Sequence, residues 1–275
     1  MPSKSRENTY GVFLSSSSYL PGVLALSQSL NNVNSVHPLT VFMTSSSPEL
    51  LDDINNHGLR YIEVSPLQPP EAIREKNISA GFSRWNGTFA KLRVLEQIQF
   101  NKIVMLNADM MVNRNIDFIF DSPHMSAVAA GAKAHPGWED LNSGFMVLEP
   151  SIAVFNQAME ILEDIGTSHL EDFTALGDQD IFQRLMPDWI TSTHLQLPES
   201  FNAFQDCLPS YERSGYLALK DAYVIHFECK PKPWDFRLGS WMPVIYRALR
   251  WGSLAEIRAL RQYRRCLAAS DATSF

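Results

Sequence analysis

The sequence has few cysteines, no excess of basic residues and no long apolar run. Its three cysteines, Cys207, Cys229 and Cys266, are odd in number and far apart, which predicts no disulfide framework and no CxxC metal site and agrees with a reducing compartment. The formal net charge of −7 makes a nucleic-acid-binding face unexpected. No window of about 18 apolar residues predicts a membrane span, and the polar N-terminus does not resemble a signal peptide. We therefore expect a cytoplasmic protein that binds no nucleic acid.

The composition and the local patterns of the first half predict an α/β fold. Of the 275 residues, 45% are hydrophobic and 19% are charged, which suits one globular domain with an ample core. Strand and helix patterns alternate there, which predicts a mostly parallel, doubly wound, Rossmann-like sheet flanked by helices. The predicted elements are, in order, a strand at 10–14, a helix at 19–30, a strand at 39–43, a helix at 48–56 and a strand at 59–64.

Two oxygen-bearing side chains follow the apolar strand predicted at 102–106. Asn107 and Asp109 are two residues apart, so on extended backbone they point to the same side. Oxygen ligands placed in this way suit a hard divalent cation such as Mg²⁺ or Mn²⁺, often together with a phosphate. Asn and Asp also favour turns, so a structural role at the junction between strand and loop is the alternative.

After residue 64, the chain predicts further strands and helices and then a basic, helical C-terminal part. A loop is expected at 65–86 and a helix at 88–99, and Trp138 and Trp234 are expected in the core. From Ile245 onward, six arginines predict one basic helix. We therefore expect a domain at 9–240 and a helical extension at 241–275. The later elements are strands at 127–130, 145–148 and 223–227 and helices at 151–165 and 178–185.

Several blocks of the chain resemble the glycogenin-like family 8 of retaining glycosyltransferases, which has a GT-A type fold. They occur in the family's order over roughly residues 9–236 and leave the C-terminal extension outside. The blocks are Lys91 with Asn107-Ala108-Asp109, then Asn115-Ile116-Asp117, Asn142-Ser143-Gly144, Gly177-Asp178-Gln179-Asp180 and His226-Phe227 with Lys232-Pro233-Trp234. The resemblance implies a nucleotide-diphospho-sugar transferase domain that uses UDP-glucose or UDP-galactose.

The resemblance also implies a nucleotide pocket and a metal site. The residues that would line the uridine pocket, with Tyr19 stacking on the base, are Leu14, Ser15, Ser16 and Tyr19. The motif Asn107-Ala108-Asp109 would bind the donor. Asn107, Asp109 and His226 would hold the metal, and the histidine favours Mn²⁺ over Mg²⁺.

The remaining implied roles concern the donor sugar and the leaving group. Asn142 and Ser143 would bind sugar hydroxyls, and Lys232 would bind the β-phosphate. The residues with implied catalytic roles at the donor sugar or its phosphates are Lys91, Asp178 and Gln179. Residue type alone leaves other interpretations open, because His226 can be a core histidine, Lys91 a solvated residue and Asp178 a helix cap.

One residue departs from the family's pattern. The metal motif begins with Asn107 where the family has a second aspartate, so Asp109 would be the sole carboxylate. The alternative hypothesis is therefore a catalytically weak or silent UDP-sugar-binding protein.

A nucleotidyltransferase is a third hypothesis. Such a protein is expected to have a Gly-rich basic loop after the first strand, but serines stand there in this chain. No counterpart of the self-glucosylated tyrosine of glycogenin is found; the acceptor is not identified, and a homodimer is left open.

Overall fold

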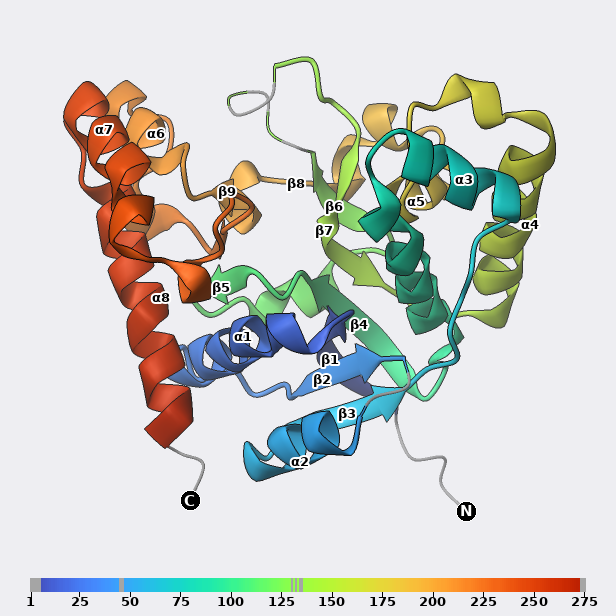
Figure 1. Ribbon diagram of the computed structural model, residues 1–275, viewed down its shortest axis with the longest axis horizontal. Helices are drawn as coiled ribbons and strands as arrows, with labels where there is room; N and C mark the ends of the chain where they lie inside the picture. The colour runs from blue at the N-terminus through green and yellow to red at the C-terminus, as the bar shows by residue number, and fades with distance from the viewer. Residues whose placement is uncertain (1–5, 45–46, 130, 132, 134–135, 273–275) are drawn as a thin grey trace.

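The computed structural model describes residues 6–44, 47–129, 131, 133 and 136–272, and a seven-stranded mixed sheet lies at its centre (Figure 1). Four neighbouring strands are parallel, whereas β7 is antiparallel to both of its neighbours. The predicted mostly parallel, doubly wound sheet is therefore confirmed. The strands are, in spatial order, β3 (Arg60–Glu63), β2 (Leu39–Met43), β1 (Glu7–Leu14), β4 (Phe100–Leu106), β7 (Leu141–Leu148), β6 (Ser126–Ala129) and β8 (Gln196–Leu197).

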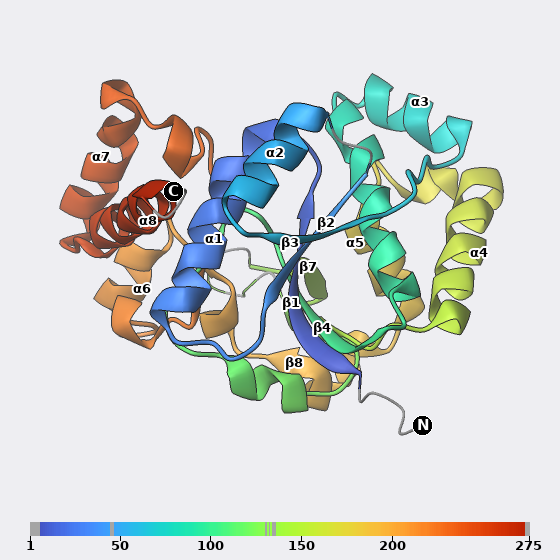
Figure 2. The same ribbon diagram turned by 90° about the horizontal axis from the view of Figure 1, so that it is seen from below.

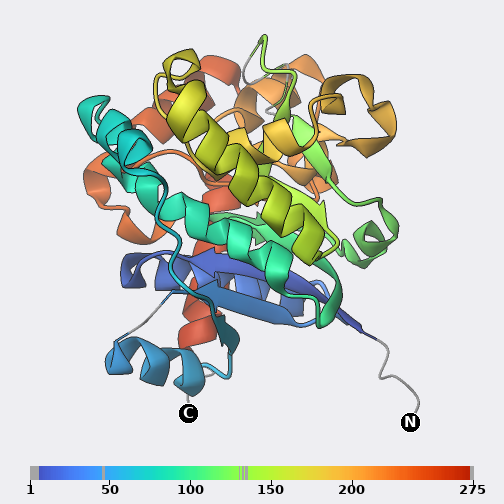
Figure 3. The same cartoon turned by 90° about the vertical axis from the view of Figure 1, so that its right-hand side faces the viewer.

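Helices cover both faces of this sheet (Figure 2). Alternate side chains of β4 point to opposite faces, so Val104 and Leu106 join one apolar cluster while Ile103 and Met105 join the other. Figure 3 shows α4 lying beside the 3-10 segment on the second face. The helices are α1 (Leu20–Asn32) and α2 (Pro48–Asn56) on the first face, and the 3-10 segment Ser83–Glu96, α4 (Ile152–Ser168) and α5 (Asp178–Leu185) on the second.

Local hydrogen bonds explain why α5 begins where the sequence predicts. The backbone N–H of Gly177 donates to Asp180 Oδ2 at 2.7 Å, and the backbone N–H of Asp178 donates to Thr88 Oγ1 at 3.1 Å. Both bonds satisfy N–H groups that a helix start leaves without an intrahelical partner. They hold Asp178 in the first turn of α5, against the 3-10 segment that contains Thr88.

A second, smaller sheet lies beside the first. Its order is β5-β10-β9, and β10 runs antiparallel to β5 so that His226 lies opposite Met110. Because β5 directly follows the turn after β4, this pairing brings the end of β10 to that turn. The strands are β5 (Met110–Val112), β9 (Ala203–Phe204) and β10 (Val224–His226).

The segment 65–86 was predicted to be a loop, and this prediction is wrong. It contains α3 (Glu71–Ser79), which begins after Pro70. The helix predicted at 88–99 is a 3-10 segment instead, which begins at Ser83 and ends at Glu96, three residues earlier than predicted. Only Ile73 and Asn77 of α3 are buried, so no apolar periodicity marked this helix. Trp138 was predicted to be in the core, but it is 56% exposed. In the strand predicted at 127–130, Ala130 lies outside the described residues.

The C-terminal part forms two helices where the sequence predicts one. They are α7 (Trp241–Trp251) and α8 (Ala255–Ala272), separated at Gly252, whose φ of +63° ends α7. Helix α8 packs along α1, and near it lies α6 (Leu208–Ser214) (Figure 1). The division into a domain and an extension stays a prediction. Among the described helices, none combines the length and the apolar character needed to cross a membrane.

Candidate functional site

Asn107 and Asp109 lie in the turn between β4 and β5, at the carboxyl end of the central strand. The backbone N–H of Asn107 donates to Gly144 O of β7 at 3.0 Å, which ties the turn to the neighbouring strand. Helix α1 approaches the turn so closely that a Cβ built on Gly22 would lie 2.4 Å from Ala108 O. Glycine at this position therefore lets the turn and α1 pack together.

Asp109 lies between two basic side chains from the end of β10 and the segment after it. Its Oδ1 is 3.2 Å from His226 Nε2, and its Oδ2 is 2.6 Å from Lys232 Nζ. Lys232 also donates to the carbonyl oxygens of Phe227 and Glu228 at 2.9 and 2.8 Å. Burial opposes ionisation of Asp109, but His226 and Lys232 outweigh it and hold the pKa of this carboxyl well below its usual range. The site therefore contains an ionised carboxylate.

A chain of side-chain hydrogen bonds determines the tautomer of His226. The backbone N–H of Gly144 donates to Asn142 Oδ1 at 2.9 Å, and Asn202 Nδ2 donates to the same oxygen at 3.1 Å. The carbonyl oxygen of Asn202 therefore faces His226 Nδ1, at 2.8 Å. Because an amide oxygen only accepts, Nδ1 carries a proton whether the ring is charged or neutral. In the charged ring, Nε2–H faces Asp109 Oδ1. Loss of the proton from Nε2 would leave a lone pair there for a metal ion.

The hydrogen-bond chain leads to a prediction for Asn202, which is 1% exposed. Asn202→Leu is expected to weaken Mn²⁺ binding by about 10- to 100-fold, because the ring loses the partner that sets its tautomer. Asn202→Asp keeps an acceptor for Nδ1–H but loses the Nδ2–H that Asn142 Oδ1 accepts, so it is expected to restore part of the affinity. Titration of Mn²⁺ monitored by electron paramagnetic resonance measures both. Equal affinities of Asn202→Leu and the unchanged chain, with both folded by circular dichroism, would contradict the assigned tautomer.

A second polar cluster surrounds Lys91, which comes from the 3-10 segment. Its Nζ lies 2.5 Å from Ser143 O, 3.3 Å from Asn107 Oδ1 and 3.4 Å from Asp178 Oδ2. Lys91 is only 6% exposed, so it is not a solvated lysine. Asp178 Oδ2 accepts no hydrogen bond within the described structure, although it is buried and paired with Lys91. The carboxylate of Asp178 is thus held by the charge of Lys91 and not by a hydrogen bond to Oδ2.

These clusters border two hollows. One has a volume of about 220 Å³ and the other about 400 Å³, and Thr88, Ser143 and Asp178 line both. The smaller is also lined by Phe13, Ser15, Tyr19, Lys91, Asn107, Ala108 and Asp109, and the larger by Trp85, Trp138, Ala175, Gly177, Gln179 and Asp180. Asp178 therefore lines both hollows.

Of the other predicted site residues, Gln179 lines the larger hollow. Leu14, Ser16 and Asn142 line neither hollow. Leu14 is 3% exposed and packs in the core, and Ser16 accepts a hydrogen bond from Ser18 N at the start of a 3-10 turn. Asn142 supports Asn202, and Gln179 Oε1 accepts a hydrogen bond from Ser143 N at 3.2 Å. Residues that the sequence analysis missed are Asn202, Thr88, Trp85 and Phe13.

Comparison with known sequences identifies a family. The family model described as Glycosyl transferase family 8 matches residues 12–237. Human glycogenin-1 is 32% identical over 151 residues, which cover 54% of this chain and 40% of the relative. Glycogenin of Neurospora crassa is 27% identical over 268 residues (90% and 36%), and the putative UDP-glucuronate:xylan alpha-glucuronosyltransferase 3 of Arabidopsis thaliana is 28% identical over 239 residues (83% and 35%). The chain thus spans less than half the length of these relatives.

Comparison with solved structures identifies the fold. The galactosyltransferase LgtC, solved in complex with donor and acceptor sugar analogues, has a TM-score of 0.57 at 17% identity, with 90% of this chain and 95% of LgtC covered. The apo form of the glycosyltransferase GlyE of Streptococcus pneumoniae has a TM-score of 0.58 at 17% identity, with 93% and 64% covered. The fold is thus that of GT-A type glycosyltransferases.

Proposed function

The chain belongs to glycosyl transferase family 8, and on this basis we propose that it is a hexosyltransferase that moves a sugar from a UDP-sugar donor to an acceptor with retention of configuration. The observation that carries the proposal is Asp109, an ionised carboxylate held between His226 and Lys232 beside a hollow lined by Tyr19 and Asp178. One relative is named for the transfer of glucuronate to xylan, so family membership alone selects neither the donor sugar nor the acceptor.

The residues around Asp109 fit a divalent metal ion. Asp109 Oδ1 and His226 Nε2 are 3.2 Å apart, so these two donor atoms would hold one ion between them. A carboxylate oxygen together with an imidazole nitrogen suits Mn²⁺, and Mg²⁺ less well. Asn107 would add an amide oxygen. A bound ion would supply Lewis-acid stabilisation of the departing diphosphate.

Lys232 contributes a second positive charge to the leaving group. It is 8% exposed, and its ammonium is held in place by Asp109 and by the carbonyl oxygens of Phe227 and Glu228. Negative charge develops on the diphosphate as its bond to the sugar breaks. A cation that is already fixed and partly desolvated stabilises this charge without reorganising.

Asp178 and Lys91 would act at the sugar. Asp178 lines both hollows, so its carboxylate would stabilise positive charge on the sugar or align the acceptor hydroxyl. Lys91 keeps this carboxyl close to Ser143, and Gln179 fixes Ser143 from the other side. Departure and attack on the same sugar face would retain the configuration.

Turnover of UDP-sugars tests the proposal. Release of UDP is measured with UDP-glucose, UDP-galactose and UDP-glucuronate, each with Mn²⁺ and with a chelator. We expect turnover of at least one donor that depends on Mn²⁺. If no donor is turned over and calorimetry detects no UDP binding, the proposal is wrong. The cytoplasmic location stays a prediction, and the homodimer stays an open alternative.

Asn107 favours a second candidate function, that of a UDP-sugar-binding protein with weak or no turnover. Its amide oxygen accepts a hydrogen bond from Lys91, and it adds no charge to the metal site. Binding of UDP without turnover would support this candidate.

Asn107→Asp separates the two candidates. The second carboxylate is expected to strengthen Mn²⁺ binding by about tenfold or more, because a charged ligand replaces an amide. Calorimetric titration measures the affinity, and UDP release measures turnover. A weak enzyme gains turnover in parallel with affinity, whereas a binding protein gains affinity alone. Asn101→Asp, which adds the same charge at an exposed position of β4, is the control and is expected to change neither.

A further inference from the structure

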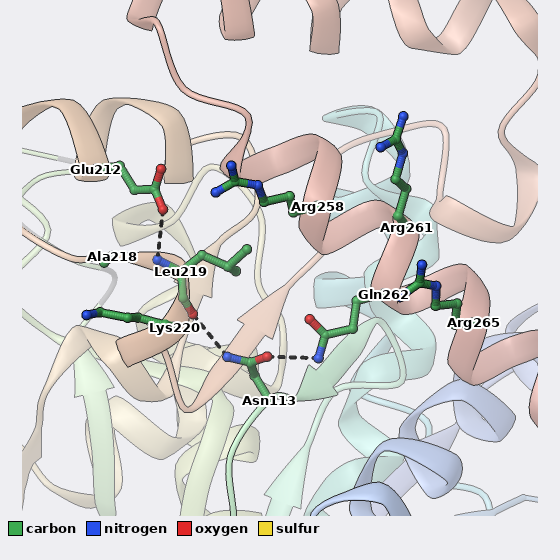
Figure 4. Close-up of a pocket in the computed structure, with 9 residues that line it drawn as sticks. All are labelled: Asn113, Glu212, Ala218, Leu219, Lys220, Arg258, Arg261, Gln262 and Arg265. Carbon is green, nitrogen blue, oxygen red and sulfur yellow. Dashed lines mark hydrogen bonds between the residues drawn. The ribbon is translucent and has the colours of Figure 1, made fainter.

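A hollow of about 700 Å³ lies between α8 and the segment 218–220 (Figure 4). One wall carries Arg258, Arg261 and Arg265 of α8, and the other carries Lys220 and Glu212. We refer to this feature as the α8 arginine hollow. Its size lies within the range of pockets that hold small ligands.

The positive charges of the α8 arginine hollow are not neutralised by the protein. Among the described residues, no carboxylate forms an ion pair with Arg258, Arg261, Arg265 or Lys220. Glu212 accepts hydrogen bonds from Leu219 N at 3.3 Å and from the Ser253 hydroxyl at 2.6 Å. Its carboxylate therefore holds neighbouring segments of the wall together.

The row of arginines concentrates positive charge on one face of α8. The arginines are three and four residues apart on one helix, so their side chains are neighbours and repel one another. The chain as a whole has 30 acidic and 23 basic residues, so a general excess of positive charge does not account for the cluster. An anion in the hollow would relieve the repulsion.

Hydrogen bonds through Asn113 link the two walls of the hollow. Gln262 Nε2 donates to Asn113 Oδ1 at 2.8 Å, and Asn113 Nδ2 donates to the carbonyl oxygens of Leu219 and Ala222 at 3.0 and 2.9 Å. Asn113 follows β5, whereas Asp109 precedes it, so the two residues lie at opposite ends of this strand. The α8 arginine hollow also shares no lining residue with the two hollows that Asp178 lines, so it is a different site.

We propose that the α8 arginine hollow binds a small polyanion that carries at least two phosphate or carboxylate groups. Arg258 and Arg265 are seven residues apart, about 10 Å along the helix, which is too far for one phosphate to contact both ends of the row. The planar guanidinium group binds phosphate and carboxylate oxygens in pairs. Tripolyphosphate and citrate are suitable probes of the two chemistries.

Calorimetry of the full chain in the presence of a chelator tests this site. Tripolyphosphate or citrate is expected to bind, and Arg261→Gln/Arg265→Gln to weaken the binding by about tenfold or more. The matched control is Arg250→Gln/Arg264→Gln, which removes the same charge. Arg250 and Arg264 do not line the hollow; Arg264 instead contacts Phe236 O and lies over the Trp241 ring. All four arginines are exposed, so both variants are expected to fold.

The outcomes are distinguishable. Stronger binding of tripolyphosphate indicates a phosphorylated ligand, and stronger binding of citrate indicates a carboxylated one; either supports the site. Equal weakening in the two double variants would show attraction to net charge alone. Loss of binding on addition of UDP would place the anion in the donor site. Either of these results, or no binding of either probe at millimolar concentration, would overturn the proposal. The test does not depend on turnover, so it stands or fails independently of the proposed transferase function.

Discussion

Asp109→Asn is expected to lower kcat/KM for UDP-sugar turnover by about 10²- to 10³-fold or more. The substitution removes the charged oxygen that pairs with His226 Nε2 at 3.2 Å, and Mn²⁺ affinity is expected to fall with activity. It also leaves Lys232 buried without its carboxylate partner. Loss of one partner of a buried ion pair destabilises a fold by about 3–5 kcal/mol. Kinetics, Mn²⁺ titration and denaturant unfolding measure the three effects.

Asp206→Asn is the control for Asp109→Asn. The ligand atoms of Asp206, Glu228 and Cys229 lie within 4.8 Å of one another near the ends of β9 and β10, so they form another group that can attract a metal. We expect this variant to keep turnover and its dependence on Mn²⁺. If Asp206→Asn loses both while Asp109→Asn keeps them, the catalytic metal is not at Asp109.

Lys232→Met is expected to lower kcat by about 10²- to 10³-fold, with a smaller change in Mn²⁺ affinity. Methionine keeps most of the volume of the lysine stem but removes the charge that stabilises the departing diphosphate. Asp109 would still face His226, so a metal-binding pair would remain. Steady-state kinetics together with Mn²⁺ titration separate the loss in kcat from a loss of metal.

Two variants distinguish this charge effect from simple disruption. Lys230→Met removes an equal charge from an exposed residue two positions earlier and is expected to leave kcat unchanged. Lys232→Arg keeps the charge and is expected to recover part of kcat. If Lys232→Arg is as inactive as Lys232→Met and both unfold at lower denaturant concentration, Lys232 only holds its loop in place.

Local patterns were sufficient for the framework of the fold. The alternation of strand and helix signals in residues 10–64 predicted the parallel arrangement around β1, and the acidic first turn at Asp178 predicted α5 with the observed bounds. These features depend on neighbours in the sequence, so they are visible there. Helix α3 was missed because it buries only Ile73 and Asn77 and so has no apolar face to detect.

The sequence by itself determined the doubly wound sheet, the family and the identity of the residues that could act on a sugar nucleotide. Only the tertiary structure decided that Asp109 lies between His226 and Lys232, because β5 and β10 pair across more than a hundred residues of chain. It also decided that Asn202 orients His226, and that Arg258, Arg261 and Arg265 face a hollow closed by the segment 218–220. Such contacts depend on how distant segments pack, so residue spacing along the chain does not predict them.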